Sequence, residues 1–338
     1  FTVADLGTFS GTGGTVNIEG ALEDPGATLL IDADRTWKLN GGTLSQVTID
    51  GDAGALLEVT SADATFDRVT LSTDTTMLTG AVVSVNGDLT LDDVTLSLIQ
   101  TRTNPNTSHF VRLNFVDAVN QTLGGVGDVV LFNASASNGG TSYARVSPTV
   151  GGSLTIGPGI TVQNRSDSHM TGVGSSSYPL TIQGTIVGQT NETFNSRMLV
   201  TGSSVLNQGT LRVSSGELDV ENLSGSVGNT DIAGRILDLD GTYQINQQVD
   251  VPSGGLRLRG DWINNSTINQ TGGTIYLMDE FQVADLGDFV GTAGSISIGG
   301  TLLDPGNTLM IDADRTWQLA GGTLSQVTIV GDPGAEFQ

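Results

Sequence analysis

The sequence of 338 residues contains no cysteine and is poor in aromatic residues (5%) and charged residues (14%). The absence of cysteine excludes a disulfide scaffold and a thiolate metal site. Soluble domains carry about 25% charged residues, so the low share here is unusual for a globular fold. No apolar run approaches the ~18 residues that a membrane span needs, and we therefore expect no membrane insertion in this segment.

Positive charge is also scarce. Lys38 is the only lysine, and the formal net charge is −23. A protein that binds nucleic acid neutralises phosphates with a basic stripe, which this chain lacks, so we expect no nucleic-acid partner. The acidic excess indicates instead a surface that keeps an extended molecule soluble.

Glycine is abundant (47 residues), and the short apolar runs between the glycines recur. Residues 1–58 align without a gap with residues 281–338, and about two-thirds of the positions are identical. Ile31–Trp37, for example, returns as Ile311–Trp317. We interpret residues 1–280 as one full unit and residues 281–338 as the start of the next tandem copy, continuous with the first.

A shorter period lies inside the long one. Leu44–Ile49, Phe66–Leu71 and Leu91–Leu96 share the pattern apolar-x-x-Val-Thr-apolar and start about 22 and about 25 residues apart. Other segments, such as Leu154–Ile156 and Leu211–Val213, alternate apolar and polar residues as strands with one buried face do. A turn of about 20–25 residues with two or three short strands predicts an all-β chain that forms a right-handed parallel β-helix. Sandwiches and propellers repeat at longer intervals.

The regular period is interrupted between residues 99 and 200. Four stretches rich in Ser, Asn and Thr predict loops, namely Gln100–Phe110, Asn133–Pro148, Gln163–Pro179 and Gln189–Arg197. Insertions at one corner of successive turns lie on one side of a solenoid. We therefore expect these loops to form a lateral patch that contacts glycan or another partner, and the candidate contact residues are Tyr143, Arg145, Arg165, His169 and Tyr178. The alternative is that these are solvated loops without a ligand.

The acidic residues suggest only weak sites. Asp32 and Asp34, with Asp312 and Asp314 in the second copy, offer two carboxylates on one side of a strand, whereas Ca²⁺ takes six to eight oxygen ligands. An Asp–Arg pair at the turn before Trp37 explains them better, and we expect no metal and no cofactor. The adjacent Asp92 and Asp93 would point to opposite faces of a strand, so we expect no catalytic pair there and no enzyme activity.

Segments such as Leu206–Val213 and Ile263–Ile275 have an Asn-x-Gly-Thr-apolar style of sequence. In this respect the chain resembles bacterial surface β-helices, namely filamentous-haemagglutinin-like adhesins and autotransporter passenger domains. The resemblance implies a secreted or cell-surface location, partners in other copies of the rod and in surface glycans, and a structural or adhesive role within a giant tandem-repeat protein. A carbohydrate-active β-helix enzyme or a glycan-binding module is the alternative.

Overall fold

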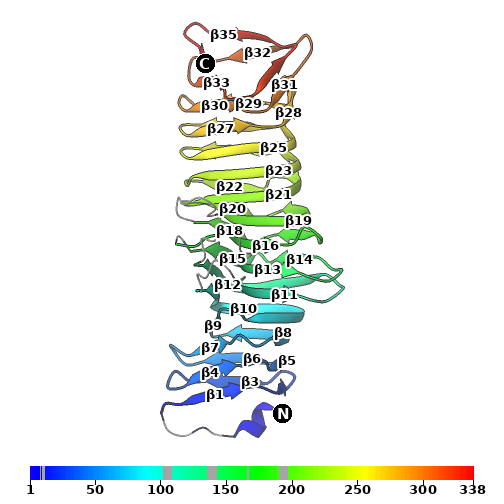
Figure 1. Ribbon diagram of the computed structural model, residues 1–338, viewed down its shortest axis with the longest axis vertical. Helices are drawn as coiled ribbons and strands as arrows, with labels where there is room; N and C mark the ends of the chain where they lie inside the picture. The colour runs from blue at the N-terminus through cyan, green and yellow to red at the C-terminus, as the bar shows by residue number, and fades with distance from the viewer. Residues whose placement is uncertain (8, 10–11, 102–108, 135–142, 166, 190–196) are drawn as a thin grey trace.

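The computed structural model describes all residues except 8, 10–11, 102–108, 135–142, 166 and 190–196. The described chain is 62% strand and 2% helix and forms one stack of about 14 turns. The N-terminus and the C-terminus lie at opposite ends of this stack (Figure 1). Strands of successive turns pair in parallel. The predicted all-β parallel solenoid is therefore confirmed.

Each turn has three faces, which we number 1 to 3 in the order in which the chain crosses them after β1. Several long strands bend at a corner and contribute to more than one face. Face 1 contains β2 (Ala21–Glu23), β5 (Thr43–Ser45), β8 (Ala64–Ser72), β10 (Val82–Gln100), β11 (Phe110–Phe115), β13 (Tyr143–Pro148), β16 (Thr171–Gly174), β19 (Met198–Asn207), β21 (Glu217–Ser226), β23 (Ile236–Ile245), β25 (Gly255–Asn264), β27 (Thr274–Leu277), β30 (Ser295–Ile298), β33 (Thr316–Leu319) and β36 (Glu336–Phe337).

The other two faces lie between these strands in chain order. Face 2 contains β3 (Thr28–Ile31), β6 (Thr48–Gly51), β12 (Gln121–Asn133), β14 (Leu154–Ile156), β17 (Leu180–Ile182), β28 (Glu280–Phe281), β31 (Thr301–Leu303) and β34 (Thr323–Ser325), together with the later parts of β8, β10, β19, β21, β23 and β25. Face 3 contains β1 (Thr15–Ile18), β4 (Thr36–Leu39), β7 (Leu56–Val59), β9 (Asp74–Met77), β15 (Gly159–Asn164), β18 (Thr185–Gly188), β20 (Thr210–Val213), β22 (Asn229–Ile232), β24 (Val249–Val251), β26 (Thr267–Gln270), β29 (Asp288–Val290), β32 (Thr308–Ile311) and β35 (Thr328–Gly331), with the ends of β10 and β12. Two short 3₁₀ helices, η1 (Val3–Leu6) and η2 (Val283–Asp285), occupy equivalent places in the two copies.

The core is a set of columns in which inward side chains of successive turns stack. On face 1, Leu22 pairs with Leu44, Leu44 with Phe66, and Phe66 with Val85. All four side chains are fully buried. Burial of a Leu or Phe side chain contributes about 1.5–3 kcal/mol, and each turn obtains it only from its neighbours.

The apolar-x-x-Val-Thr-apolar pattern forms a corner between two faces. In each example the third residue adopts the left-handed conformation, with φ of 55° at Gln46, 52° at Arg68 and 56° at Asp93. The first apolar residue then points inward on one face and the last on the next, as Leu44 and Ile49 do. One left-handed residue thus bends the chain without a loop.

The interruptions of the regular period share one corner. Residues 102–108, 135–142, 166 and 190–196 each lie between a face-3 strand and the following face-1 strand, and they themselves lie outside the described residues. The longest turns place paired residues 33 or 34 positions apart. Gln100 and Asn133 are one such pair, and their side chains bond to each other. Two predicted loops were too long, because Tyr143–Pro148 forms β13 and Thr171–Gly174 forms β16. Their small inward residues, such as Ala144 and Val173, fill the core and allow pairing.

Candidate functional site

The five predicted contact residues do not form one patch. Tyr143 and Arg145 lie together on β13, where both side chains point outward from face 1. Arg165 and His169 lie at the corner between faces 3 and 1, and Tyr178 lies between β16 and β17, at the corner between faces 1 and 2. The structure therefore brings two of the five together.

Tyr143 and Arg145 belong to a larger group on the outer side of face 1, which we call the arginine–aromatic cluster: Phe110, Arg112, Tyr143 and Arg145. β11 and β13 pair in register, so that Phe110 lies beside Tyr143 and Arg112 beside Arg145. The guanidinium carbon of Arg112 is 4.0 Å from the ring centroid of Phe110 and 4.9 Å from that of Tyr143. That of Arg145 is 5.5 Å from the Tyr143 ring. The cluster thus alternates two cations with two aromatic rings.

The two arginines of the cluster are close to one another, and no described carboxylate bonds to them. Their Nε atoms are buried and have no hydrogen-bond partner among the described residues. Burial lowers the pKa of Arg145, Tyr143 opposes this shift, the neighbouring Arg112 adds to it, and the negative charge of Glu221 opposes it. The adjoining segments 102–108 and 135–142 contain no Asp or Glu in their sequence. In a chain with a net charge of −23, the cluster thus places two arginines side by side, with no hydrogen bond to a described carboxylate.

Such a cluster suits a ligand with both an anionic group and an apolar face. A guanidinium presents several N–H donors in a planar fork that matches carboxylate and sulfate oxygens. An aromatic ring offers an apolar face against which the C–H side of a sugar packs. Gly172 lies in the next turn, and a Cβ there would be 2.9 Å from Nε of Arg145. The small residue gives the guanidinium room to lie flat.

Sequence reasoning missed Phe110 and Arg112, although a signal was present. Phe110-Val-Arg112 and Tyr143-Ala-Arg145 repeat the pattern aromatic-x-Arg at the spacing of one long turn. The match was overlooked because the rest of the sequence predicts a shorter turn of about 20–25 residues. The longer loops here lengthen the turn, yet the strands on either side still pair in register.

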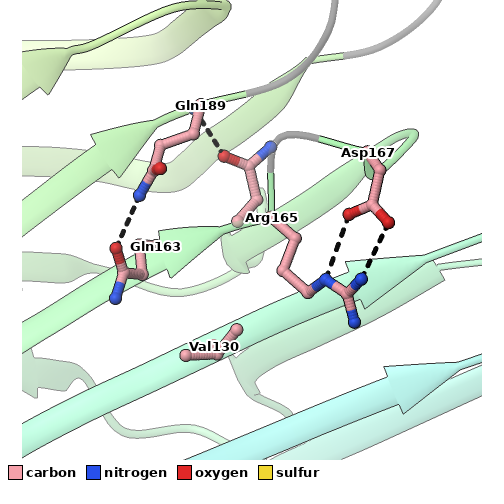
Figure 2. Close-up of a pocket in the computed structure, with 6 residues that line it drawn as sticks. Val130, Gln163, Arg165, Asp167 and Gln189 are labelled. Carbon is pink, nitrogen blue, oxygen red and sulfur yellow. Dashed lines mark hydrogen bonds and ion pairs between the residues drawn. The ribbon is translucent and has the colours of Figure 1, made fainter.

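Arg165 lies in an open hollow on the neighbouring side (Figure 2). Its guanidinium donates two hydrogen bonds to Asp167, with Nε–Oδ1 and Nη2–Oδ2 distances of 3.0 and 2.7 Å. It also lies 4.2 Å above the ring of Phe132. Gln163 and Gln189 on the same wall bond to each other. Arg165, Asp167 and the two glutamines therefore already have partners within the chain. Asn164 also lines the hollow and accepts a hydrogen bond from the Gln189 backbone N–H, while its Nδ2 has no partner among the described residues.

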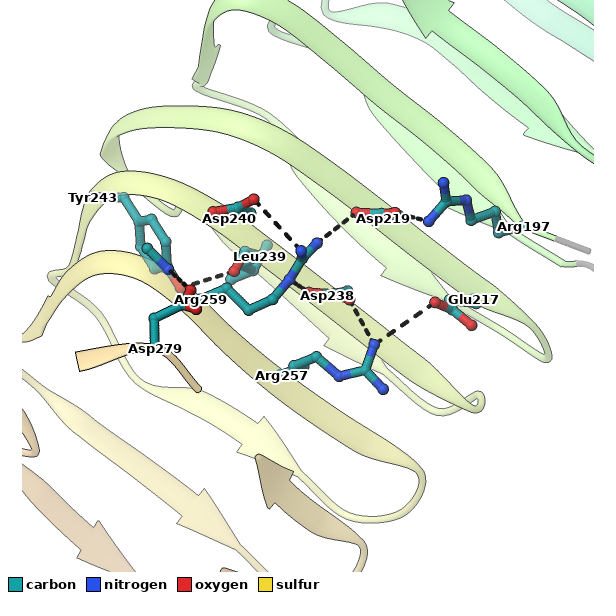
Figure 3. A network of polar contacts seen from close by, with 11 residues as sticks. Arg197, Glu217, Asp219, Asp238, Leu239, Asp240, Tyr243, Arg257, Arg259 and Asp279 are labelled. Atoms are coloured by element: carbon teal, nitrogen blue, oxygen red, sulfur yellow. Dashed lines mark hydrogen bonds and ion pairs between the residues drawn. The ribbon is translucent and has the colours of Figure 1, made fainter. Parts of the chain in front are cut away.

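A dense ion-pair network covers face 1 further along the stack (Figure 3). The Asp219 and Asp238 side chains are 1% and 4% exposed. Arg259 bonds to both, at 3.3 Å from Asp219 Oδ1 and 2.7 Å from Asp238 Oδ1. Arg197 pairs with Asp219, and Arg257 with Asp238. Burial raises the pKa of Asp219 to about 6 despite the opposing effect of Arg197.

The weak metal candidates lie in turns. Asp32 pairs with Arg35, and Asp312 with Arg315 at 3.1 Å, so the Asp–Arg pair before each Trp is present in both copies. Asp34 and Asp314 are exposed. No group of three or more His, Asp or Glu side chains within the described residues is arranged to hold a metal ion.

One expectation about Asp92 and Asp93 was wrong. Both side chains are exposed, because Asp93 adopts the left-handed conformation and strand alternation ends at this corner. Neither residue faces the core.

Comparisons with known proteins identify no relative. No protein-family model matches the chain, and neither the curated proteins nor the solved structures contain a match. No helix within the described residues has the length and apolarity needed to cross a membrane.

Proposed function

We propose that the chain is a segment of an extracellular structural rod, built from tandem units and located on a bacterial surface or in its matrix. The observation that carries this proposal is the parallel stack along face 1, in which the second copy pairs directly onto the first through β27 and β30. A solenoid can be lengthened by adding turns, because each new turn pairs with the turn before it and extends the same core. The acidic surface keeps such rods soluble and apart.

The rod also adheres, in this proposal, through the arginine–aromatic cluster. Its ligand class is an acidic polysaccharide, whose carboxylate or sulfate groups bind Arg112 and Arg145 and whose sugar rings pack against Phe110 and Tyr143. Support comes from the alternation of rings and guanidinium groups on the outer side of one face. Other surfaces of the rod repel polyanions, so binding would be local.

The test uses immobilised polygalacturonate and heparin, with neutral dextran as the reference surface. We expect the wild-type chain to bind both anionic polymers, and the double variant R112Q/R145Q to bind at least ten-fold more weakly. The matched control is R68Q/R212Q, which removes two exposed arginines elsewhere and changes the net charge equally. Equal losses in both double variants, or no binding by the wild type, would contradict an adhesive role for the cluster.

The mechanical part of the proposal is tested separately by electron microscopy of single particles. About 14 turns with a rise of ~4.8 Å give a rod of about 67 Å. A globular particle would contradict it, whatever the polysaccharide assay shows.

A carbohydrate-active enzyme is the second candidate, because one observation favours it. Asp219 and Asp238 are neighbouring carboxylates on the outer side of face 1, and glycosidases use such pairs with one raised pKa. Both carboxylates are held by arginines and almost fully buried, which favours a structural role. Release of reducing ends from polygalacturonate by the wild type, abolished in D219N, would support the enzyme.

A further inference from the structure

The two copies of the repeated segment pair internally in the same way. Val16 pairs with Trp37 in the first copy, and Ile296 pairs with Trp317 in the second. In both copies a Phe ring meets the Trp edge-on, at 5.3 Å for Phe9–Trp37 and 6.2 Å for Phe289–Trp317. The local structure is thus retained when the sequence returns.

The two copies nevertheless occupy different faces. Starting at β2, successive pairings along face 1 lead through β5, β8, β10, β11, β13, β16, β19, β21, β23, β25 and β27 to β30, which is twelve steps. The counterpart of β2 in the second copy is β31, which follows β30 and lies on face 2. The repeated unit therefore comprises twelve complete turns plus one third of a turn, which shifts the second copy by one face.

The corner residues show the same offset. Gln46 bends the chain between faces 1 and 2, whereas its counterpart Gln326 bends it between faces 2 and 3, with φ of 55° and 57°. All three faces present short strands with inward Leu, Ile and Val. A copy that starts one face later therefore finds an equivalent apolar column to pair with, as Ile296 does on Ile275.

We propose that tandem units of this protein are related by a rotation of one third of a turn about the rod axis. A given surface then points in a different direction in each of three consecutive units, and the fourth unit repeats the orientation of the first. Arginine–aromatic clusters on such an array face three directions at intervals of about 59 Å. In combination with the proposed adhesion, on which this consequence rests, the rod would bind polysaccharide on all sides and cross-link a matrix.

The rotation is testable in this chain by distances between spin labels, because the sequence has no cysteine. Leu30 is 69% exposed on face 2. One variant pairs L30C with M310C. Met310 is the sequence counterpart of Leu30 in the second copy, and it lies on face 3. The other pairs L30C with L303C, which lies on face 2.

We expect the L30C/L303C pair to give the shorter modal distance, about 58 Å for twelve steps of ~4.8 Å along one face. The L30C/M310C pair should be longer by about 5 Å, because its labels are also separated by about 20 Å across the rod. Equal distances, or the reverse order, would overturn the rotation. The distances do not depend on a ligand, so the result is independent of the polysaccharide assay.

Discussion

Arg259 is the central cation of the face-1 ion-pair network, and its replacement by leucine measures what one shared arginine contributes to two buried carboxylates. The side chain bonds to Asp238 at 2.7 Å and to Asp219 at 3.3 Å, and it lies 3.5 Å from Asp240. The R259L variant keeps an aliphatic side chain at this position but removes the charge. It leaves the two buried carboxylates with one arginine each, Arg197 for Asp219 and Arg257 for Asp238.

The expected loss of stability in R259L is about 3 kcal/mol. Removal of one partner from a buried ion pair costs about 3–5 kcal/mol, and the remaining arginines place R259L at the lower end. The matched control is R212L, because Arg212 bonds to Asp231 at 2.7 Å but both side chains are about half exposed. Exposed pairs contribute less than about 1 kcal/mol.

Urea unfolding followed by circular dichroism measures both variants at pH 7, and hydrogen exchange of residues 217–245 reports on the affected turns themselves. The triple variant R259L/D219N/D238N should recover most of the loss, since the buried charges are gone. If R259L and R212L lose the same stability within about 1 kcal/mol, the network does not depend on Arg259 and the reasoning is refuted.

Two further predictions concern a buried carboxyl group and a crowded glycine. The raised pKa of Asp219 means that its contribution to stability is complete below about pH 4 and is lost as the pH rises through about 6. Between pH 4 and 7 the free energy of unfolding should therefore fall less in D219N than in the wild type, by up to about 3 kcal/mol. The control is D231N, at an exposed carboxylate. A pH dependence of stability in D219N equal to that of the wild type would contradict the burial effect. G125A should destabilise the chain by several kcal/mol more than G26A, because both glycines have positive φ (85° and 80°) but only at Gly125 would a Cβ meet backbone, 1.9 Å from the carbonyl oxygen of Leu91. Similar thermal midpoints for the two alanine variants would show that the close approach between turns is relaxed at little cost.

The candidate site could be predicted only in part. Tyr143 and Arg145 were found because an aromatic residue and an arginine stand out in a stretch rich in Ser and Asn. Their neighbours Phe110 and Arg112 lie one long turn earlier in the sequence, where the regular period gives no register.

The ion-pair network was missed for a related reason. Asp238 is 19 residues from Arg257 and 21 residues from Arg259, and all three lie on strands that read as ordinary amphipathic strands. Which charges meet across such strands depends on the register between turns, and a change of one residue in that register would separate them.

The fold class could be predicted from the sequence. Alternation of apolar residues, glycines at the turns and the return of the first segment at residue 281 are patterns along the chain, and stacked apolar columns are the arrangement in which such thin turns bury a core. Which residues lie side by side, and on which face the second copy begins, followed only from the folded stack. The register between turns depends on the number of residues in each turn and on where each corner falls. At Asp93, for example, the left-handed backbone shifts the register by one residue against the next turn.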